Sequence, residues 1–458
     1  MKIEELLTHP EGKTLEFKQD LSSPKNIMKT LTAFANTAGG VLLIGIEDGS
    51  KAIIGVENPL DEEERLCNLI ADSIEPRLVP NVELVHWKGR IVLAVEVYPS
   101  PLRPHWIKSQ GIENGVLVRV GSTNRQADGL LIAELRRSVM SRSFDEEPMP
   151  EINPEVLDFR VASGLLTDLK KWHENTPENL LLITRYQGRL VPTVGGILLF
   201  GTVRERYFPD AWIQCGRFGG IDKAKIIDQR DIRNHLPLAL NDAFEFVKKH
   251  ALQSAEFGEL RRKNGWSVPL EAVREALTNA VVHADYSLTG APIRVAIFDD
   301  RIEIESPGML VAGMTIGDIR AGVSKLRNRV IGRVFKELDL IEQWGSGFQR
   351  MAAACREMGL PEPVIEEQAF HFRVTFRLKR AAEYSQVDAT EQKIMELLRA
   401  READGGASTQ DLSRVLGMTS RSIRARIARL LSAGKIVAVG KSAFDPRKRY
   451  LPVKGEEL

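Results

Sequence analysis

The last seventy residues hold the pattern that most limits what this chain can fold into. Residues 390–401 have the apolar spacing of a helix. Ser408 fits the cap of a second helix, which Gly417 would end. A third helix begins near Ser420 and ends at Gly434, and two short strands, KIVAVG and KRYLP, follow it. Three helices followed by a hairpin predict a small independent domain at this end of the chain.

Positive charge is concentrated in the same part of the chain. The whole sequence has 63 Lys and Arg against 62 Asp and Glu, yet residues 412–454 hold eleven basic residues and one acid. A helix-turn-helix followed by a hairpin is the order of a winged helix domain, which places a helix in the major groove of DNA. The predicted DNA-binding residues are Arg421, Arg424, Arg426, Arg429, Arg447, Lys448 and Arg449. The alternative is a protein-interaction module whose arginines form a solvated face.

The length of 458 residues predicts about three domains. An acidic, proline-rich stretch at residues 144–155 predicts a first linker, and a second break falls near residues 379–387. The apolar run Val194–Phe200 is typical of a buried strand. The predicted domains are residues 1–143, a connector at 150–265, then 266–380 and 386–458.

Composition narrows the cellular setting. No apolar run approaches the roughly 18 residues that cross a bilayer, so no membrane partner is expected. The three cysteines lie far apart and form no CxxC pair. Both features favour a protein of the reducing cytoplasm.

A helix predicted after Pro269 places an acid and an amide on one face. Glu275 and Asn279 are four residues apart, and such a pair can orient a water and hold Mg²⁺ on a nucleotide phosphate. A strand pair follows, and then WGSGFQRM with Gly345 and Gly347. Glycines after strands let backbone N–H groups approach phosphate. The alternative is that Glu275 and Asn279 serve as helix caps or core hydrogen-bonding groups.

These segments resemble the GHKL ATPases, which include gyrase and the histidine kinases. The resemblance is strongest to a bacterial branch labelled transcriptional regulators or RecG-like helicases, and runs through EALTNAVVHADY, IEIESPGML and RNRVIGRVFKELDLIEQWGSGFQRM. It implies an α/β sandwich that binds ATP with Mg²⁺. It also implies that Glu275 activates water and that Asn279 binds the metal. By the same resemblance, Gly345 and Gly347 belong to the phosphate-binding loop, and Ser306 and Gly308 belong to the adenine-binding loop.

One position departs from that family pattern. GHKL proteins usually place an Asp in the adenine-binding loop, and this chain has ESPG. Glu305 could substitute; the alternative is a site that binds nucleotide weakly or not at all. Weak ATP hydrolysis fits the resemblance, but helicase activity does not, because the chain has no GxxxxGK[ST] phosphate loop. His283 and Asp285 fit a helix end and a turn better than acid–base catalysis.

The first 135 residues resemble the Schlafen AlbA-type domain through LEFK, AFANTAGG and LIGIEDG. Many members bind DNA, and the Schlafen core can be a metal-dependent ribonuclease. The resemblance implies that Glu11, Glu16 and Asp48 would hold Mg²⁺ or Mn²⁺ against an RNA or DNA phosphodiester. The alternative is a nucleic-acid-binding or dimerising platform, in which Glu16 and Lys18 form a salt bridge on one strand and Asp48 lies in an ordinary turn.

The sequence therefore predicts a multidomain α/β and α+β protein with an N-terminal Schlafen AlbA-type α/β domain, a GHKL-like α/β sandwich and a C-terminal winged helix-turn-helix. The expected function is a cytoplasmic, ATP-responsive, DNA-binding transcriptional regulator. A homodimer or higher oligomer is expected because one winged helix rarely supplies enough specific affinity. The alternatives are a nucleotide-gated nuclease, with defence as one role, and an inactive dimeric scaffold.

Overall fold

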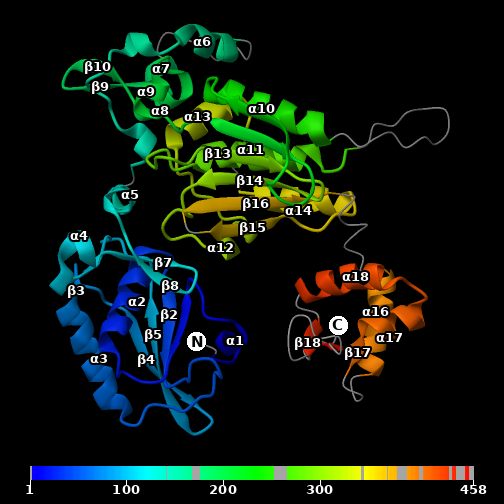
Figure 1. The fold of residues 1–458 in the computed structure, drawn as a ribbon. Coiled ribbons are helices and arrows are strands. Elements are labelled where there is room, and N and C mark those ends of the chain that lie inside the picture. The colour runs from blue at the N-terminus through cyan, green and yellow to red at the C-terminus, as the bar shows by residue number, and fades with distance from the viewer. Residues whose placement is uncertain are drawn as a thin grey trace. The chain divides into compact units, whose positions relative to one another are not determined.

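The structure is a computed structural model. It describes residues 3–140, 142–167, 176–251, 266–341, 345–368, 370–378, 389–401, 406–432, 436–439 and 449–452. The chain divides into two compact units, residues 1–378 and residues 379–458 (Figure 1). Among the helices of these ranges, none is both long and apolar enough to span a membrane.

The N-terminal part is built on a four-stranded sheet in the order β1-β2-β5-β4. β1 runs parallel to β2, and the other two pairings are antiparallel. Its elements are α1 (Ile3–Thr8), β1 (Leu15–Lys18), α2 (Pro24–Asn36), β2 (Gly40–Ile44), α3 (Pro59–Ser73), β3 (Ile74–Glu75), β4 (Asn81–Trp87), β5 (Arg90–Val97), β6 (Trp106–Ile107), α4 (Gly111–Gly115), β7 (Leu117–Val120), β8 (Thr123–Gln126) and α5 (Gly129–Val139).

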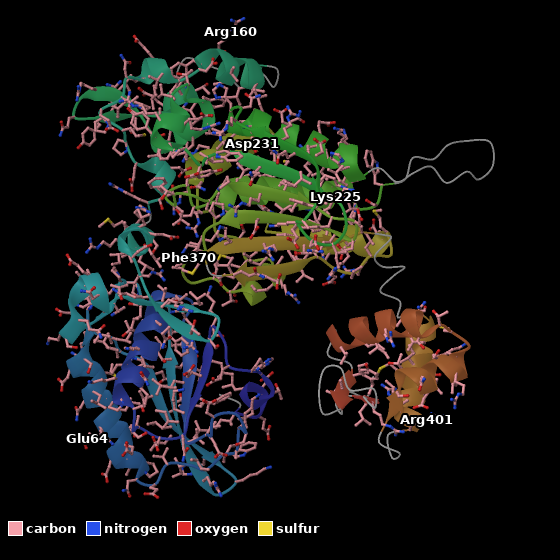
Figure 2. The ribbon with its side chains drawn as sticks, in the orientation of Figure 1. Glu64, Arg160, Lys225, Asp231, Phe370 and Arg401 are labelled. Atoms are coloured by element: carbon pink, nitrogen blue, oxygen red, sulfur yellow. The ribbon has the colours of Figure 1, made fainter. Side chains whose placement is uncertain are left out.

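Helix α2 supplies much of this core because its apolar residues recur at helical spacing. Ile27, Leu31, Phe34 and Ala35 are fully buried, and they belong to one cluster with residues of β2 and β5. Pro24 is tolerated at the first turn, where no backbone N–H is needed. Figure 2 shows the side chains that fill the space between the sheet and its helices.

The stretch predicted to be a linker is packed into the fold. Asp145 is fully buried, and its carboxylate accepts the backbone N–H groups of Arg329 at 3.0 Å and Ile331 at 2.9 Å. The N–H of Met149 bonds to the carbonyl of Pro192 at 2.8 Å. The acidic residue Asp145 accepts N–H groups at a helix end, and the prolines fix turns. The linker prediction was therefore wrong for this segment.

The region from residue 150 to 210 contains short elements. They are α6 (Phe159–Thr167), α7 (Thr176–Asn179), β9 (Ile183–Tyr186), β10 (Arg189–Pro192), α8 (Val194–Phe200) and α9 (Arg204–Tyr207). The strand predicted at Val194–Phe200 was wrong, because this run forms helix α8. Its residues are all buried, and the Thr193 side chain caps it by accepting the N–H of Gly196 at 2.9 Å. A short, fully apolar run has no periodicity that separates helix from strand.

A six-stranded sheet in the order β12-β11-β13-β14-β16-β15 forms the centre of residues 213–378. Helices α10 and α11 lie along it, and α14 packs against α11 (Figure 1). The elements are β11 (Ile213–Phe218), β12 (Ile226–Ile232), α10 (Leu236–Ala251), α11 (Leu270–His283), β13 (Ile293–Ile297), β14 (Arg301–Pro307), α12 (Ile316–Arg320), α13 (Arg329–Glu337), α14 (Gly347–Glu357), β15 (Val364–Gln368) and β16 (His371–Arg377).

The second unit has its own small core. Its elements are α16 (Ala389–Ala400), β17 (Ala407–Ser408), α17 (Thr409–Leu416), α18 (Ser420–Ser432), β18 (Ile436–Val439) and β19 (Arg449–Pro452). Ser408 and Asp411 form a capping box on α17, and Gly417 ends that helix in the left-handed conformation. The sequence predicted Ser408 as the cap of this helix and Gly417 as its end. Ile394, Leu398, Leu412, Ile423 and Ile427 meet in the core.

Candidate nucleotide site

A cavity opens between α11, the end of β14, the loop after it and the start of α14. Its empty space, counting the open mouth, is about 1070 Å³. Six residues singled out in the sequence line it together: Glu275, Asn279, Ser306, Gly308, Gly345 and Gly347. The fold therefore gathers into one place residues that lie up to 72 positions apart in the chain.

Glu275 and Asn279 present their side chains from successive turns of α11. Asn279 Nδ2 donates to Glu275 Oε1 at 3.1 Å, and Arg350 on α14 donates to Glu275 Oε2 at 2.8 Å. Asn279 Oδ1 is thus the amide atom left to offer lone pairs to a cation. Both residues line the cavity, so they lie on one face of α11, as the sequence predicted.

Gly347 lies at the start of α14, directly against this pair. A Cβ on Gly347 would collide with Glu275 Oε1 and would lie 3.5 Å from Asn279 Nδ2. Gly345 has a φ of 71°, and a Cβ there would collide with the carbonyl of Gly322. Gly345 therefore needs glycine, whereas a side chain at Gly347 would have to displace the Glu275 carboxylate. The backbone at Gly347 lies close to the acid–amide pair.

The end of β14 forms another wall of the cavity. Ser306 is buried, and the N–H of Gly308 donates at 2.7 Å to the carbonyl of Phe370, at the turn between β15 and β16 (Figure 2). Side chains alternate along a strand, so Ile304 and Ser306 line the cavity and Glu305 does not. Glu305 instead pairs with Arg373 at 3.1 Å. The structure does not bring Glu305 to the predicted adenine-binding position.

The remaining lining is apolar on one side and basic on the other. Lys325 and Arg327, which the sequence interpretation did not select, belong to the basic side. Arg327 is buried and pairs with Glu134 and with Asp285, the latter at 3.3 Å. The basic run around KLRNR was the signal that could have indicated them. The apolar side includes Ile304, Met314, Ile319, Phe348, Met351, Ile365, Phe372 and Val374.

Asp285 lies in the turn expected of it, and His283 is the last residue of α11. Asp285 Oδ1 accepts the backbone N–H and the hydroxyl of Ser287 at 3.1 and 2.6 Å, which makes a turn after α11. His283 lines the cavity, and burial together with the positive charge of Arg327 lowers its pKa to about 4. The imidazole is therefore neutral near pH 7.

Of the three carboxylates predicted to bind a metal in the N-terminal domain, Glu11 and Glu16 have different partners. Glu11 Oε1 accepts the N–H of Phe17 at 2.7 Å, and Asp48 lies exposed in a turn. Glu16 is buried and pairs with Lys18 at 2.5 Å and with Arg119. Over the ranges that the structure describes, no group of three or more His, Cys, Asp or Glu side chains is suited to hold a metal ion. The structure thus shows the Glu16–Lys18 salt bridge and does not assemble the proposed Mg²⁺ or Mn²⁺ site.

Three of the predicted DNA-binding arginines have described side chains. Arg424 is exposed on α18, Arg426 bonds to the Ser422 hydroxyl at 2.6 Å, and Arg449 bonds to the carbonyl of Gly406 at 3.2 Å. Arg447 and Lys448 and the side chains of Arg421 and Arg429 lie outside the described part.

Three family models match consecutive parts of the chain. Residues 11–128 match "Schlafen, AlbA_2", residues 290–376 match "Putative ATP-dependent DNA helicase recG C-terminal", and residues 387–437 match "Winged helix-turn-helix DNA-binding". The chain combines these three domain types. The three resemblances and the multidomain α/β and α+β fold class are therefore confirmed.

The second of these matches begins after Glu275 and Asn279 and includes the cavity residues of β14 and the glycine loop. An ATPase-type domain joined to a winged helix DNA-binding domain supports, in general terms, a DNA-binding regulator.

Two solved structures resemble parts or all of the chain. The DIP2311 protein of Corynebacterium diphtheriae is 18% identical over 98% of both chains, with a TM-score of 0.41. The N-terminal domain of a RecG-related protein from Nitrosomonas europaea is 26% identical, with a TM-score of 0.23, and the match covers 27% of this chain and 90% of that one.

Proposed function

We propose that this protein is an ATP-responsive DNA-binding transcriptional regulator. The observation that carries the proposal is the cavity in which Glu275 and Asn279 face the backbone of Gly345 and Gly347, beside an apolar wall. The apolar wall can contact the base of a nucleotide, and the backbone N–H groups at the glycines can bind its phosphates. This combination in one cavity favours a nucleotide over other small molecules.

The residues present fit ATP carrying Mg²⁺. The amide oxygen of Asn279 would be the protein ligand to the metal, which would neutralise phosphate charge. The N–H groups around Gly347 and the ammonium of Lys325 would bind phosphate oxygens. Ser306 and the backbone at Gly308 would take the place of the family's Asp in reading the base.

The same geometry favours binding over rapid turnover. Both oxygens of Glu275 already accept hydrogen bonds, one from Asn279 and one from Arg350. One acceptor position on each oxygen is therefore occupied, which leaves fewer positions for a hydrogen bond from an attacking water. Nucleotide occupancy, with slow hydrolysis, would then set the regulatory state.

DNA binding is assigned to the winged helix, with Arg424 as an exposed contact on α18. A homodimer would present two such domains to a two-fold symmetric site. Nucleotide in the cavity would shift the dimer between states of different DNA affinity, as a ligand does when it binds one state more tightly. RNA remains a second class of nucleic acid to test.

The experiment is a pair of titrations on the full chain. Calorimetry with Mg²⁺ and a non-hydrolysable ATP analogue should show saturable binding that Asn279→Ala weakens at least tenfold, about 1.4 kcal/mol. Fluorescence anisotropy with duplex DNA should then show an affinity that changes with the analogue in the unmodified protein and not in Asn279→Ala. Equal analogue affinity in both proteins would reject the nucleotide part of the proposal.

A further inference from the structure

A second hollow opens beside the nucleotide cavity and shares part of its lining. Glu275, Asn279, His283, Ser324 and Lys325 line both. The second hollow continues along α13, where its lining adds Arg329, Arg333, Lys336 and Glu337. A ligand group that leaves the cavity past Asn279 would therefore enter the second hollow.

Helix α13 is amphipathic, and its polar face is basic. Arg329, Arg333 and Lys336 recur at positions i, i+4 and i+7, which places them on one side of the helix. Between them, Val330, Ile331, Val334 and Phe335 are buried. The packing of this apolar face fixes the direction of the basic face, so the three cations are held along one wall of the hollow.

Positive charge exceeds negative charge in this hollow. Lys325, Arg329, Arg333 and Lys336 contribute four cations against the carboxylates of Glu275 and Glu337, and Arg329 also forms an ion pair with Glu146 at 3.9 Å. The Glu275 carboxylate is already paired with Arg350. Burial, followed by the nearby charges of Arg103 and Arg329, lowers the pKa of Lys325, so the ammonium lies among charges that repel it. An anion between these side chains would relieve that repulsion.

We propose that the basic hollow on α13 binds the outer part of a polyphosphate chain and so makes the cavity selective for nucleoside triphosphates over diphosphates. The inference rests on the proposed nucleotide function and adds the residues that distinguish a triphosphate from a diphosphate. Lys336 and Arg333 are the specificity-determining residues, since they lie beyond the Glu275–Asn279 pair that the two hollows share. Charge-assisted contacts to phosphate are about twice as strong as neutral hydrogen bonds, so each lost cation should be measurable.

A solvated helix face would also carry basic residues, and it predicts a different result. On a simple solvated face the cations would have no preference among anions, and their loss would leave nucleotide selectivity unchanged. The feature that separates the two cases is the shared lining, because it joins the cations to the acid–amide pair.

The test compares the affinities of Mg-ATP analogue, Mg-ADP and inorganic tripolyphosphate for the full chain. Lys336→Gln is the first variant, because Lys336 is exposed and its loss should not disturb folding. The second is Arg333→Gln together with Lys336→Gln, and Arg333 gives up a hydrogen bond to the carbonyl of Asn179. Arg356→Gln is the matched control, because Arg356 pairs with Glu362 on the surface and lines neither hollow. Circular dichroism melting of each variant establishes that it is folded.

We expect the unmodified protein to prefer the triphosphate at least tenfold. Lys336→Gln should reduce that preference about threefold and the double variant about tenfold, with Mg-ADP affinity nearly constant and Arg356→Gln without effect. Tripolyphosphate should compete with the analogue, and less well in the variants. An unchanged preference in folded variants would overturn the inference and leave the nucleotide function standing.

Two further outcomes are decisive. If the unmodified protein binds no nucleotide, the proposed function fails. Tripolyphosphate binding that the variants lose would then still support an anion site in the basic hollow. Absence of tripolyphosphate binding as well would reject both the proposed function and this inference. A single-stranded oligonucleotide arm tests the competing ligand class. Loss of oligonucleotide binding in Lys336→Gln, with nucleotide preference intact, would assign the hollow to nucleic acid and overturn the inference.

Discussion

The guanidinium of Arg350 on α14 lies 2.8 Å from the carboxylate of Glu275 on α11. The other oxygen of that carboxylate accepts the amide of Asn279 at 3.1 Å. We predict that Arg350→Gln raises steady-state phosphate release from ATP several-fold, because it frees an acceptor position on Glu275 Oε2 for the attacking water. Nucleotide affinity should stay within about threefold, as measured by calorimetry.

The control for this prediction is Glu275→Gln, which should reduce any turnover by about 10² or more. A tenfold fall in turnover in Arg350→Gln would contradict this prediction, because it would show that Arg350 holds Glu275 in its productive position.

Elements with strong hydrophobic periodicity or with clear cap and turn residues were predicted from the sequence. Elements without such local signals were missed. The cap at Ser408 and the helix end at Gly417 were predicted correctly, because each is a local signal. Val194–Phe200 is apolar throughout, so only its packing and the Thr193 cap decide that it is helical. Asp145 was assigned to a linker because its partners, the N–H groups of Arg329 and Ile331, lie far along the chain.

The candidate site was predictable in part for the same reason. The spacing of Glu275 and Asn279 fixes their common helix face, and the resemblance indicated the glycines that complete the cavity. Glu305 was proposed from residue type alone, and strand alternation turns it toward Arg373. The pairing of Arg350 with Glu275 is a contact between two helices that no local pattern encodes.

Asp145 gives the unfolding free energy a specific pH dependence. Burial raises its folded-state pKa from 3.8 to about 6. Between these values the folded state binds more protons than the unfolded state, so this group's stabilisation is full below pH 4 and is lost as the pH rises through about 6. Asp145→Asn should flatten the stability profile between pH 4 and 7 by an amount on the order of 2 kcal/mol.

Urea unfolding at closely spaced pH values checks this prediction. Asn keeps an oxygen that can accept one of the two N–H groups, so the variant should stay folded. Parallel profiles for the two proteins would show that Asp145 does not titrate in this range.

Glu16 is expected to be a structural residue. It is the buried partner of Arg119, whose side chain is 1% exposed, so Glu16→Ala leaves an unpaired cation inside the domain. Removing one partner of a buried pair typically costs about 3–5 kcal/mol, and we predict a marked fall in the melting temperature. A melting temperature equal to that of the unmodified protein would contradict this role.

This role also changes how a nuclease test must be designed. Loss of cleavage in Glu16→Ala would report unfolding as readily as lost chemistry, whereas Asp48 is exposed and Asp48→Ala should preserve the fold. We expect transfer RNA, single-stranded DNA and plasmid to remain intact with Mg²⁺ or Mn²⁺, with and without ATP. Cleavage that Asp48→Ala abolishes would establish the nuclease alternative.

Arg424 should contribute to DNA affinity through phosphate. We predict that Arg424→Ala weakens duplex binding for all sequences by a similar factor and lowers the slope of log affinity against log salt by about 1. Fluorescence anisotropy at four salt concentrations measures both quantities. Loss of affinity for one sequence only would instead indicate base recognition.

Nucleotide binding in the cavity is most directly tested at Gly347. A Cβ at this position would collide with the Glu275 carboxylate, whereas Gly164 lies on α6 with open space around it. Calorimetric titration of a Mg-ATP analogue should show binding to the unmodified protein and to Gly164→Ala with equal affinity, and at least a tenfold loss in Gly347→Ala, with circular dichroism melting showing that both variants are folded. Equal affinity in all three proteins, or no binding to any, would contradict the assignment of this cavity to ATP.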